Sequence, residues 1–124
     1  MATVLVVDDQ LESGHLLTRI LRYLGHQGVH VPSGEDALEY LHSNQPDAVL
    51  LDYMMPGMDG LQVLKKLRED PRTKKMPVII FSANGDPKIV QTAMEQGASD
   101  YWVKASLAIA DMESRLSYWL EQNN

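Results

Sequence analysis

The sequence contains no cysteine, and this absence removes several kinds of chemistry at once. Without a thiol the chain has no disulfide, cysteine nucleophile, iron–sulfur cluster or cysteine-ligated zinc. Long apolar runs are missing too, because a run such as Val4–Val7 falls far short of the roughly 20 residues that span a bilayer. The N-terminus also lacks the pattern of a secretory signal. These absences predict a cytoplasmic protein that does not engage a membrane.

Positive charge is scarce as well. The chain has 11 Lys and Arg against 17 Asp and Glu, a net charge of −6, so a general attraction to nucleic acid is not expected. Most of the basic residues lie between Lys65 and Lys75, where Glu69 and Asp70 interrupt them. We interpret that segment as a solvated helix end and loop rather than as a binding patch.

No linker, low-complexity tract or internal repeat divides the 124 residues. This length suits one domain with its own core, and we therefore predict a single domain over residues 1–124. Short runs rich in Val, Ile and aromatic residues, bounded by Gly, Pro, Asn or Asp, predict five strands. They lie at 3–8, 28–31, 48–52, 77–82 and 100–104.

The segments between these strands have helical spacing, with apolar residues three and four positions apart. Helix-end signals agree with this reading: Ser33 with Asp36 resembles a capping box, Pro87 suits a first turn, and Gly25 and Gly97 suit helix ends. Strands that are apolar almost throughout, alternating with helices, are typical of a parallel sheet covered on both faces. The sequence therefore predicts a doubly wound α/β fold.

Polar residues stand at the carboxyl ends of four predicted strands. Asp8 and Asp9 end the first, Asp52 the third, Ser82 the fourth and Lys104 the fifth. In a doubly wound sheet the ligand site lies beyond these ends. Each residue alone has an ordinary explanation as a cap, a turn residue or a solvated charge. One shared site is a better account than four separate coincidences.

The chemistry of this set is that of phosphoryl transfer. Three neighbouring carboxylates repel one another, and a hard divalent cation such as Mg²⁺ would relieve the repulsion. With the cation and Lys104 neutralising charge, and the Ser82 hydroxyl donating a hydrogen bond, the rim can hold a phosphoryl group. Asp52 is the candidate nucleophile, because it stands alone after the central strand while Asp8 and Asp9 form a pair suited to metal binding.

Four motifs together resemble the receiver domain of two-component response regulators: VVDD at 6–9, DYMMPGMDG at 52–60, FSA at 81–83 and GASDYWVK at 97–104. The resemblance covers nearly the whole chain. It implies a flavodoxin-like fold with a parallel sheet in the order 2-1-3-4-5, an order that the residues alone do not supply. It also implies a signalling module, not an enzyme, whose phosphoryl acceptance and slow dephosphorylation are self-catalysed.

The resemblance assigns a metal site to the first and third strand ends. Asp52 corresponds to the phosphoacceptor. Asp9, Asp52 and the backbone carbonyl of Met54 correspond to ligands of Mg²⁺, for which Mn²⁺ can substitute, and Asp8 would act through a water molecule.

The resemblance also assigns the switch residues. Ser82 is similar to the hydroxyl residue that moves toward the phosphoryl group, and Tyr101 to the aromatic residue that swaps between outward and inward rotamers. Lys104 is similar to the lysine that pairs with the aspartate and its phosphoryl oxygens. Tyr101 and Trp102 are adjacent on a predicted strand, so their side chains are expected to face opposite ways.

The implied partners are a histidine kinase or a histidine phosphotransfer protein as donor, and a downstream protein as target. The target would read the surface made by the helix after Ser82, the strand at 100–104 and the last helix. Because the chain ends soon after that helix, we expect output through a partner, through a domain outside this sequence, or through a phosphorylation-dependent dimer of a resting monomer.

Two alternatives stay open at this point. One is an adaptor that keeps the fold without switching, which the full acidic set together with Ser82 and Lys104 argues against. The other is a small Mg²⁺-dependent hydrolase that uses Asp52 as a turnover nucleophile. Met54, two residues after Asp52, cannot serve as its general acid.

Two departures from the family pattern carry expectations of their own. Ala105 follows Lys104 where the family commonly has a proline after a cis bond. A cis bond before a non-proline residue costs about 3 to 4 kcal/mol, so we predict a trans bond. Met54 and Asn84 occupy positions beside the path of the attacking water, and a thioether cannot orient water as a carboxamide can, so we predict slow hydrolysis.

Overall fold

The computed structural model describes residues 1–122, in which strands and helices alternate. Each predicted strand is confirmed to within one residue at either end. The elements are β1 (Thr3–Val7), α1 (Leu11–Tyr23), β2 (Gln27–Val31), α2 (Gly34–Ser43), β3 (Ala48–Leu51), α3 (Gly60–Glu69), β4 (Val78–Ser82), α4 (Pro87–Glu95), β5 (Asp100–Val103) and α5 (Ile109–Gln122).

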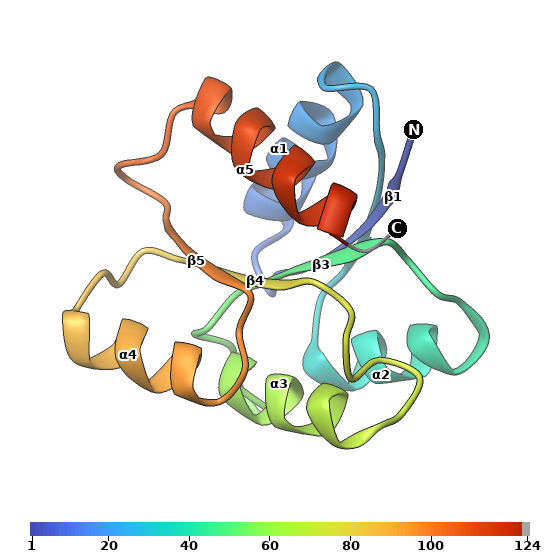
Figure 1. Cartoon of the computed structure of the whole chain (residues 1–124), viewed down its shortest axis with the longest axis vertical. Helices are drawn as coiled ribbons and strands as arrows, with labels where there is room; N and C mark the ends of the chain where they lie inside the picture. The colour runs from blue at the N-terminus through green and yellow to red at the C-terminus, as the bar shows by residue number, and fades with distance from the viewer. Residues whose placement is uncertain (123–124) are drawn as a thin grey trace.

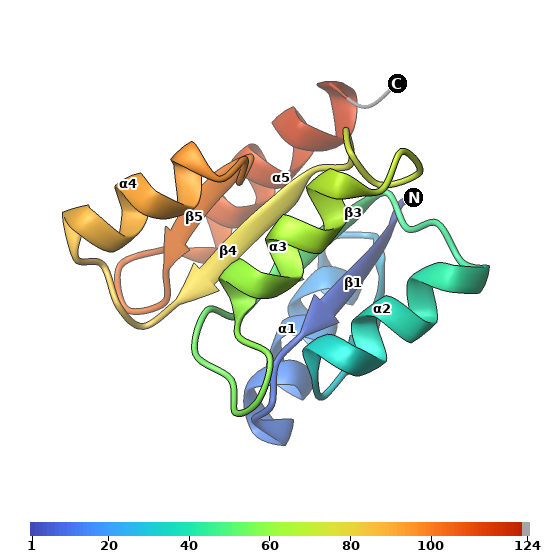
Figure 2. The same cartoon turned by 90° about the horizontal axis from the view of Figure 1, so that it is seen from below.

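The strands form one parallel sheet in the order β2-β1-β3-β4-β5, so the predicted fold class and strand order are both confirmed. Helices α1 and α5 cover one face of the sheet, and α2, α3 and α4 cover the other (Figure 1). All four strand pairings are parallel, and in Figure 2 the arrows of β1, β4 and β5 point the same way. The carboxyl ends of the strands therefore meet along one edge.

The hydrophobic core lies on both faces of this sheet. Strand β3 and all of β1 after Thr3 are buried, which explains why they read as continuous apolar runs. Alternate residues of β5 divide between the faces, as predicted: Tyr101 packs with the α2, α3 and α4 side and Trp102 with the α1 and α5 side. Trp102 is fully buried, and its indole N–H and that of Trp119 both donate to the Asp100 carboxylate.

Helix ends follow the sequence signals with one addition. The Ser33 hydroxyl accepts a hydrogen bond from the Asp36 N–H, and Pro87 lies in the first turn of α4. Reciprocal capping occurs at α3, where Asp59 and Gln62 each accept from the backbone N–H of the other. Among residues 1–122, no helix combines the length and apolarity needed to cross a membrane.

The basic segment at 65–75 contains one residue that sequence reasoning placed wrongly. Four of its lysines are solvent-exposed, but Arg68 is half-buried. Its guanidinium donates to the carbonyls of Gly97, Thr73, Lys74 and Met76 at 2.9, 3.1, 3.0 and 2.8 Å, and to the Ser99 hydroxyl at 3.4 Å. Arg68 therefore ties α3 to the loops before β4 and β5 instead of presenting a solvated charge.

Candidate functional site

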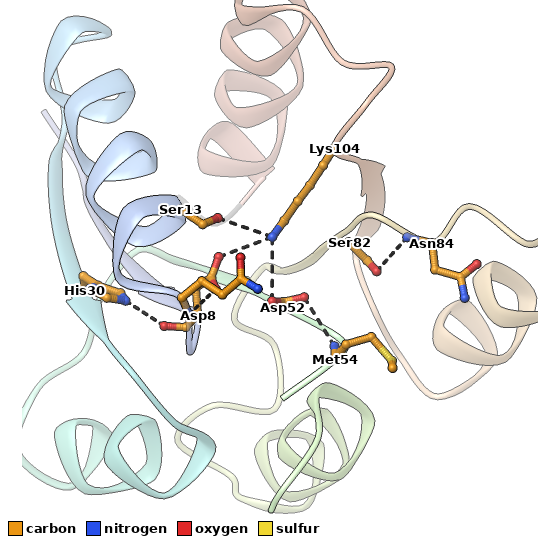
Figure 3. Close-up of polar contacts among 9 residues, drawn as sticks. Asp8, Ser13, His30, Asp52, Met54, Ser82, Asn84 and Lys104 are labelled. Carbon is orange, nitrogen blue, oxygen red and sulfur yellow. Dashed lines mark hydrogen bonds and ion pairs between the residues drawn. The ribbon is translucent and has the colours of Figure 1, made fainter. Parts of the chain in front are cut away.

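The edge where the parallel strands end gathers the predicted residues in one place (Figure 3). Asp8 directly follows β1 and Asp52 directly follows β3. Ser82 is the last residue of β4, and Lys104 directly follows β5. Because adjacent parallel strands bring their carboxyl ends side by side, four short segments far apart in sequence supply one polar cluster.

Three carboxylates form the acidic part of the cluster. Ligand oxygens of Asp8, Asp9 and Asp52 all lie within 4.8 Å of one another. Asp8 is 1% exposed and Asp52 is 7% exposed, while Asp9 is exposed to solvent. An all-oxygen set with two buried carboxylates and one facing water fits Mg²⁺, which prefers oxygen ligands and keeps part of its water shell. The family resemblance implies this ion, and the three carboxylates can hold it.

Lys104 supplies the opposing charge. Its ammonium Nζ lies 3.4 Å from the Asp8 Oδ2 and 3.7 Å from the Asp52 Oδ2. It also donates to the Ser13 hydroxyl at 3.3 Å and lies 5.5 Å from the centre of the Phe81 ring. One ammonium shared between two carboxylates leaves the cluster net negative, so a further cation is favourable there.

The electrostatics of the cluster act most strongly on Asp52. Burial is the largest influence and raises the pKa of its carboxyl, and Asp8 and Asp9 raise it further. Lys104 and a hydrogen bond from the Met54 N–H at 3.3 Å act in the opposite direction. The resulting pKa is about 6, so a bound cation would favour the ionised form that a nucleophile requires.

The turn after Asp52 brings the chain back against the strand it has just left. The Gly60 N–H donates to the Tyr53 carbonyl at 2.9 Å. A Cβ at position 60 would lie 2.4 Å from the backbone carbonyl of Asp52, which no side chain tolerates. Met55 is buried beneath this turn, whereas Met54 is 64% exposed beside the acidic cluster. The role of the Met54 carbonyl as a metal ligand stays a prediction.

Ser82 and Tyr101 meet at the loop between β4 and α4. Ser82 is fully buried, and its hydroxyl accepts from the Asn84 N–H at 3.1 Å. Tyr101 is 8% exposed and its hydroxyl donates to the Asn84 carbonyl, which is the inward rotamer. Burial raises the pKa of the Tyr101 phenol. The two predicted switch residues therefore hold the same short loop. The bond between Lys104 and Ala105 is trans, as predicted.

Two residues near the cluster were missed from the sequence. Ser13 lies in the first turn of α1, and its hydroxyl accepts a hydrogen bond from Lys104. The available signal was a hydroxyl residue at the start of the helix that follows Asp8 and Asp9. His30 reaches from β2 to the backbone of Asp8 (Figure 3). No local sequence pattern indicated this contact, because His30 and Asp8 lie in different elements, 22 residues apart.

A comparison with protein families identifies the family of this chain. The model of the "Response regulator receiver domain" family matches residues 4–116. This chain belongs to the response regulator receiver domains. Receiver domains are signalling domains, not classical enzymes, and they interact with histidine kinases and downstream effectors. They bind Mg²⁺ at an acidic pocket, which corresponds here to the Asp8, Asp9 and Asp52 cluster.

Individual relatives agree with this membership. The chain is 36% identical to the protein PilH of Pseudomonas aeruginosa, with 84% of this receiver domain and 86% of PilH covered. It is also 36% identical to the transcriptional regulatory protein AfsQ1 of Streptomyces coelicolor, covering 84% of this chain but 45% of AfsQ1, which is about half of that relative's length. The BeF3-activated receiver domain of RstA from Klebsiella pneumoniae is 31% identical with a TM-score of 0.89, over 97% of this chain and 99% of that one.

Proposed function

We propose that this receiver domain accepts a phosphoryl group on Asp52 from a phosphohistidine of a histidine kinase or histidine phosphotransfer protein. The observation that carries the proposal is the position of the Lys104 ammonium between two buried carboxylates, 3.4 Å from Asp8 and 3.7 Å from Asp52. The description of the RstA receiver domain as BeF3-activated lends support to the same kind of activation here.

The transfer step balances with the groups at hand. A carboxylate oxygen of Asp52 attacks phosphorus, so that an O–P bond forms while the N–P bond to the donor imidazole breaks and its electron pair leaves with the imidazole. Asp9, Asp52 and the Met54 carbonyl would hold Mg²⁺, with Asp8 acting through water. When bound, the ion neutralises charge on the transferred phosphoryl oxygens. Lys104 lies close enough to Asp52 to pair with the same oxygens.

Ser82 and Tyr101 would convert this local event into a change of surface. A phosphoryl group adds a charge of about −2, which attracts the Lys104 ammonium and a donor hydroxyl. Ser82 now accepts from Asn84, and its rotatable hydroxyl proton is available for donation to the phosphoryl group. Phosphorylation would then shift the balance between inward and outward Tyr101 and thereby the α4, β5 and α5 surface that a downstream partner reads.

The alternatives receive less support from the cluster. A hydrolase needs a general acid beside Asp52, and the nearest candidate position holds the thioether of Met54. A non-switching adaptor has no use for an ammonium held between carboxylates or for a buried hydroxyl at the end of β4. A phosphorylation-controlled switch uses all of these groups.

Intact-mass spectrometry after incubation with acetyl phosphate and Mg²⁺ tests the proposal. We expect one added phosphoryl group, about 80 Da, which requires both the metal and Asp52 as the nucleophile. The controls are a sample with a chelator and the Asp52→Asn variant. Failure to gain mass with acetyl phosphate, and also with a phosphorylated histidine phosphotransfer protein, would leave the adaptor as the better account.

A further inference from the structure

His30 makes a contact with the acidic loop that the proposed chemistry does not use. Its Nε2 lies 2.8 Å from the backbone carbonyl oxygen of Asp8 (Figure 3). Since a carbonyl only accepts hydrogen bonds, Nε2 is the donor, and both the Nε2-protonated neutral ring and the imidazolium can make this bond. The Asp8 N–H in turn donates to the Val31 carbonyl at 3.1 Å. Strand β2 therefore holds both backbone groups of Asp8.

The space for the His30 ring is provided by a glycine of α1. A Cβ at Gly14 would lie between 2.3 and 2.5 Å from three atoms of the imidazole, so a side chain at position 14 and the ring cannot coexist in these places. Gly14 lies inside α1, where glycine is unfavourable compared with alanine. The ring of His15 packs edge-on against His30 at 5.9 Å between centroids. Two residues of α1, Gly14 and His15, therefore position the His30 ring next to the loop that carries Asp8 and Asp9.

The carbonyl that His30 holds belongs to the peptide joining Asp8 to Asp9. Fixing that peptide plane fixes the direction in which the chain presents Asp9, the solvent-facing member of the acidic cluster. The Asp8 side chain is held separately, because its Oδ1 accepts from the Gln10 N–H at 2.9 Å. Preorganised ligands bind a metal more tightly than mobile ones. The residues that hydrogen-bond to the ligands commonly fix the ligands' orientation.

We propose that His30, seated against Gly14, is a positioning residue for the divalent-cation site: by holding the Asp8–Asp9 peptide it preorganises the carboxylates that take Mg²⁺. The inference rests on the proposed function, because it concerns the same cation. It predicts that the acidic cluster loses affinity for Mg²⁺ when the imidazole donor is removed, even though no carboxylate changes.

Calorimetric titration with MgCl₂ tests this positioning role in four folded variants, with amide NMR spectra as the check on folding. His30→Phe keeps a ring but removes the donor, and we expect the Kd for Mg²⁺ to rise about tenfold. Gly14→Ala leaves His30 in the sequence but displaces its ring, and we expect a similar loss. His30→Gln restores an N–H donor and should recover most of the affinity. His15→Phe, which alters the neighbouring ring only, should stay within about twofold of wild type.

The outcomes separate the two proposals. Wild-type binding together with unchanged affinity in His30→Phe and Gly14→Ala would overturn the positioning role and leave the proposed function standing. An equal loss in His15→Phe would also overturn it, because the effect would then be one of general packing. Absence of Mg²⁺ binding by the wild-type chain would overturn the proposed cation site and the role of His30 with it. If His30→Phe does not fold, Gly14→Ala and His30→Gln decide the question.

Discussion

Two half-buried cations sit at opposite kinds of site in this receiver domain. Lys104 faces carboxylates, with its ammonium 3.4 Å from Asp8 and 3.7 Å from Asp52. Arg68 faces only neutral groups, four backbone carbonyls and the Ser99 hydroxyl. Burial lowers the pKa of the Arg68 guanidinium, but guanidinium stays protonated in proteins. Each residue carries one positive charge, but Lys104 offsets negative charge whereas Arg68 satisfies neutral backbone groups.

The two sites differ in how completely the groups around each cation are compensated. Arg68 distributes its donors over fixed carbonyls in two loop segments, so its bonds define one arrangement of the chain. Lys104 has only part of the positive charge that its carboxylates need, and its contacts are long for ion pairs. A cluster of this kind can be rearranged by a new ligand at little cost. We therefore assign the Arg68 region to stability and, under the proposed function, the Lys104 region to switching.

Arg68→Met gives the largest expected effect on this comparison. The substitution removes every donor and leaves buried carbonyls without partners, so we expect the free energy of unfolding to fall by about 3 kcal/mol. Urea denaturation measures this loss. Under conditions where the variant is folded, its phosphorylation rate should remain close to that of wild type. A stable variant with impaired phosphorylation would reverse the assigned roles.

Lys104→Met is expected to give the opposite result. Losing the ammonium removes the charge that pairs with the phosphoryl oxygens, so the initial rate of phosphorylation by acetyl phosphate should fall about 100-fold. The free energy of unfolding should change by less than about 1 kcal/mol, because the Lys104 side chain is 25% exposed and its contacts of 3.4 and 3.7 Å are long for ion pairs. Rates from intact mass and midpoints from urea denaturation, measured beside Arg68→Met, give the comparison. Equal phosphorylation rates in the two variants would contradict it.

Asp52→Asn should stabilise the metal-free protein. The folded pKa of about 6 lies above the ordinary value of 3.8, so the unfolded chain binds fewer protons between these values and stability falls as pH rises from about 4 to 6. Asparagine removes that loss. Two pKa units correspond to roughly 3 kcal/mol, and solvent screening reduces this to about 1 to 2 kcal/mol. Denaturation at pH 7.5 should show the gain, and at pH 4 or with saturating Mg²⁺ it should shrink. A loss of stability at pH 7.5 would contradict this account.

Met54→Asn is the smallest and most local change. Met54 is exposed beside the cluster, and a carboxamide there can orient the attacking water where a thioether cannot. We expect the phosphorylated form to lose its phosphoryl group about three- to tenfold faster, a change of about 1 kcal/mol in the barrier. Decay of the phosphorylated mass after removal of the donor measures the rate. An unchanged or slower decay would count against the prediction of slow hydrolysis in the wild-type chain.

Much of this arrangement could be predicted from the sequence, because the relevant signals are local. Asp52 and Lys104 stand at the ends of apolar runs, and such runs end together in a parallel sheet. The Asp59–Gln62 capping box was not predicted, although its signal is also local: an aspartate followed three residues later by a glutamine at the start of an apolar helical pattern.

The remaining features depend on tertiary contacts that leave no local pattern. Arg68 binds backbone carbonyls, which every residue possesses, so nothing in the sequence distinguishes its partners. His30 and Gly14 come from different elements, and their fit appears only once α1 is packed on β2. Strand order also depends on tertiary packing and leaves no local pattern, so it came from the family resemblance and not from the residues themselves.

The most direct test of the account is to identify which of the three carboxylates carries the phosphoryl group. Borohydride converts an acyl phosphate of aspartate into homoserine, and peptide mapping by mass spectrometry then locates the converted residue. We predict conversion at Asp52 alone, since Asp52 stands by itself after β3 at 3.7 Å from Lys104, whereas Asp8 and Asp9 form the adjacent pair assigned to metal binding. Conversion at Asp8 or Asp9, or a distribution over all three, would contradict it.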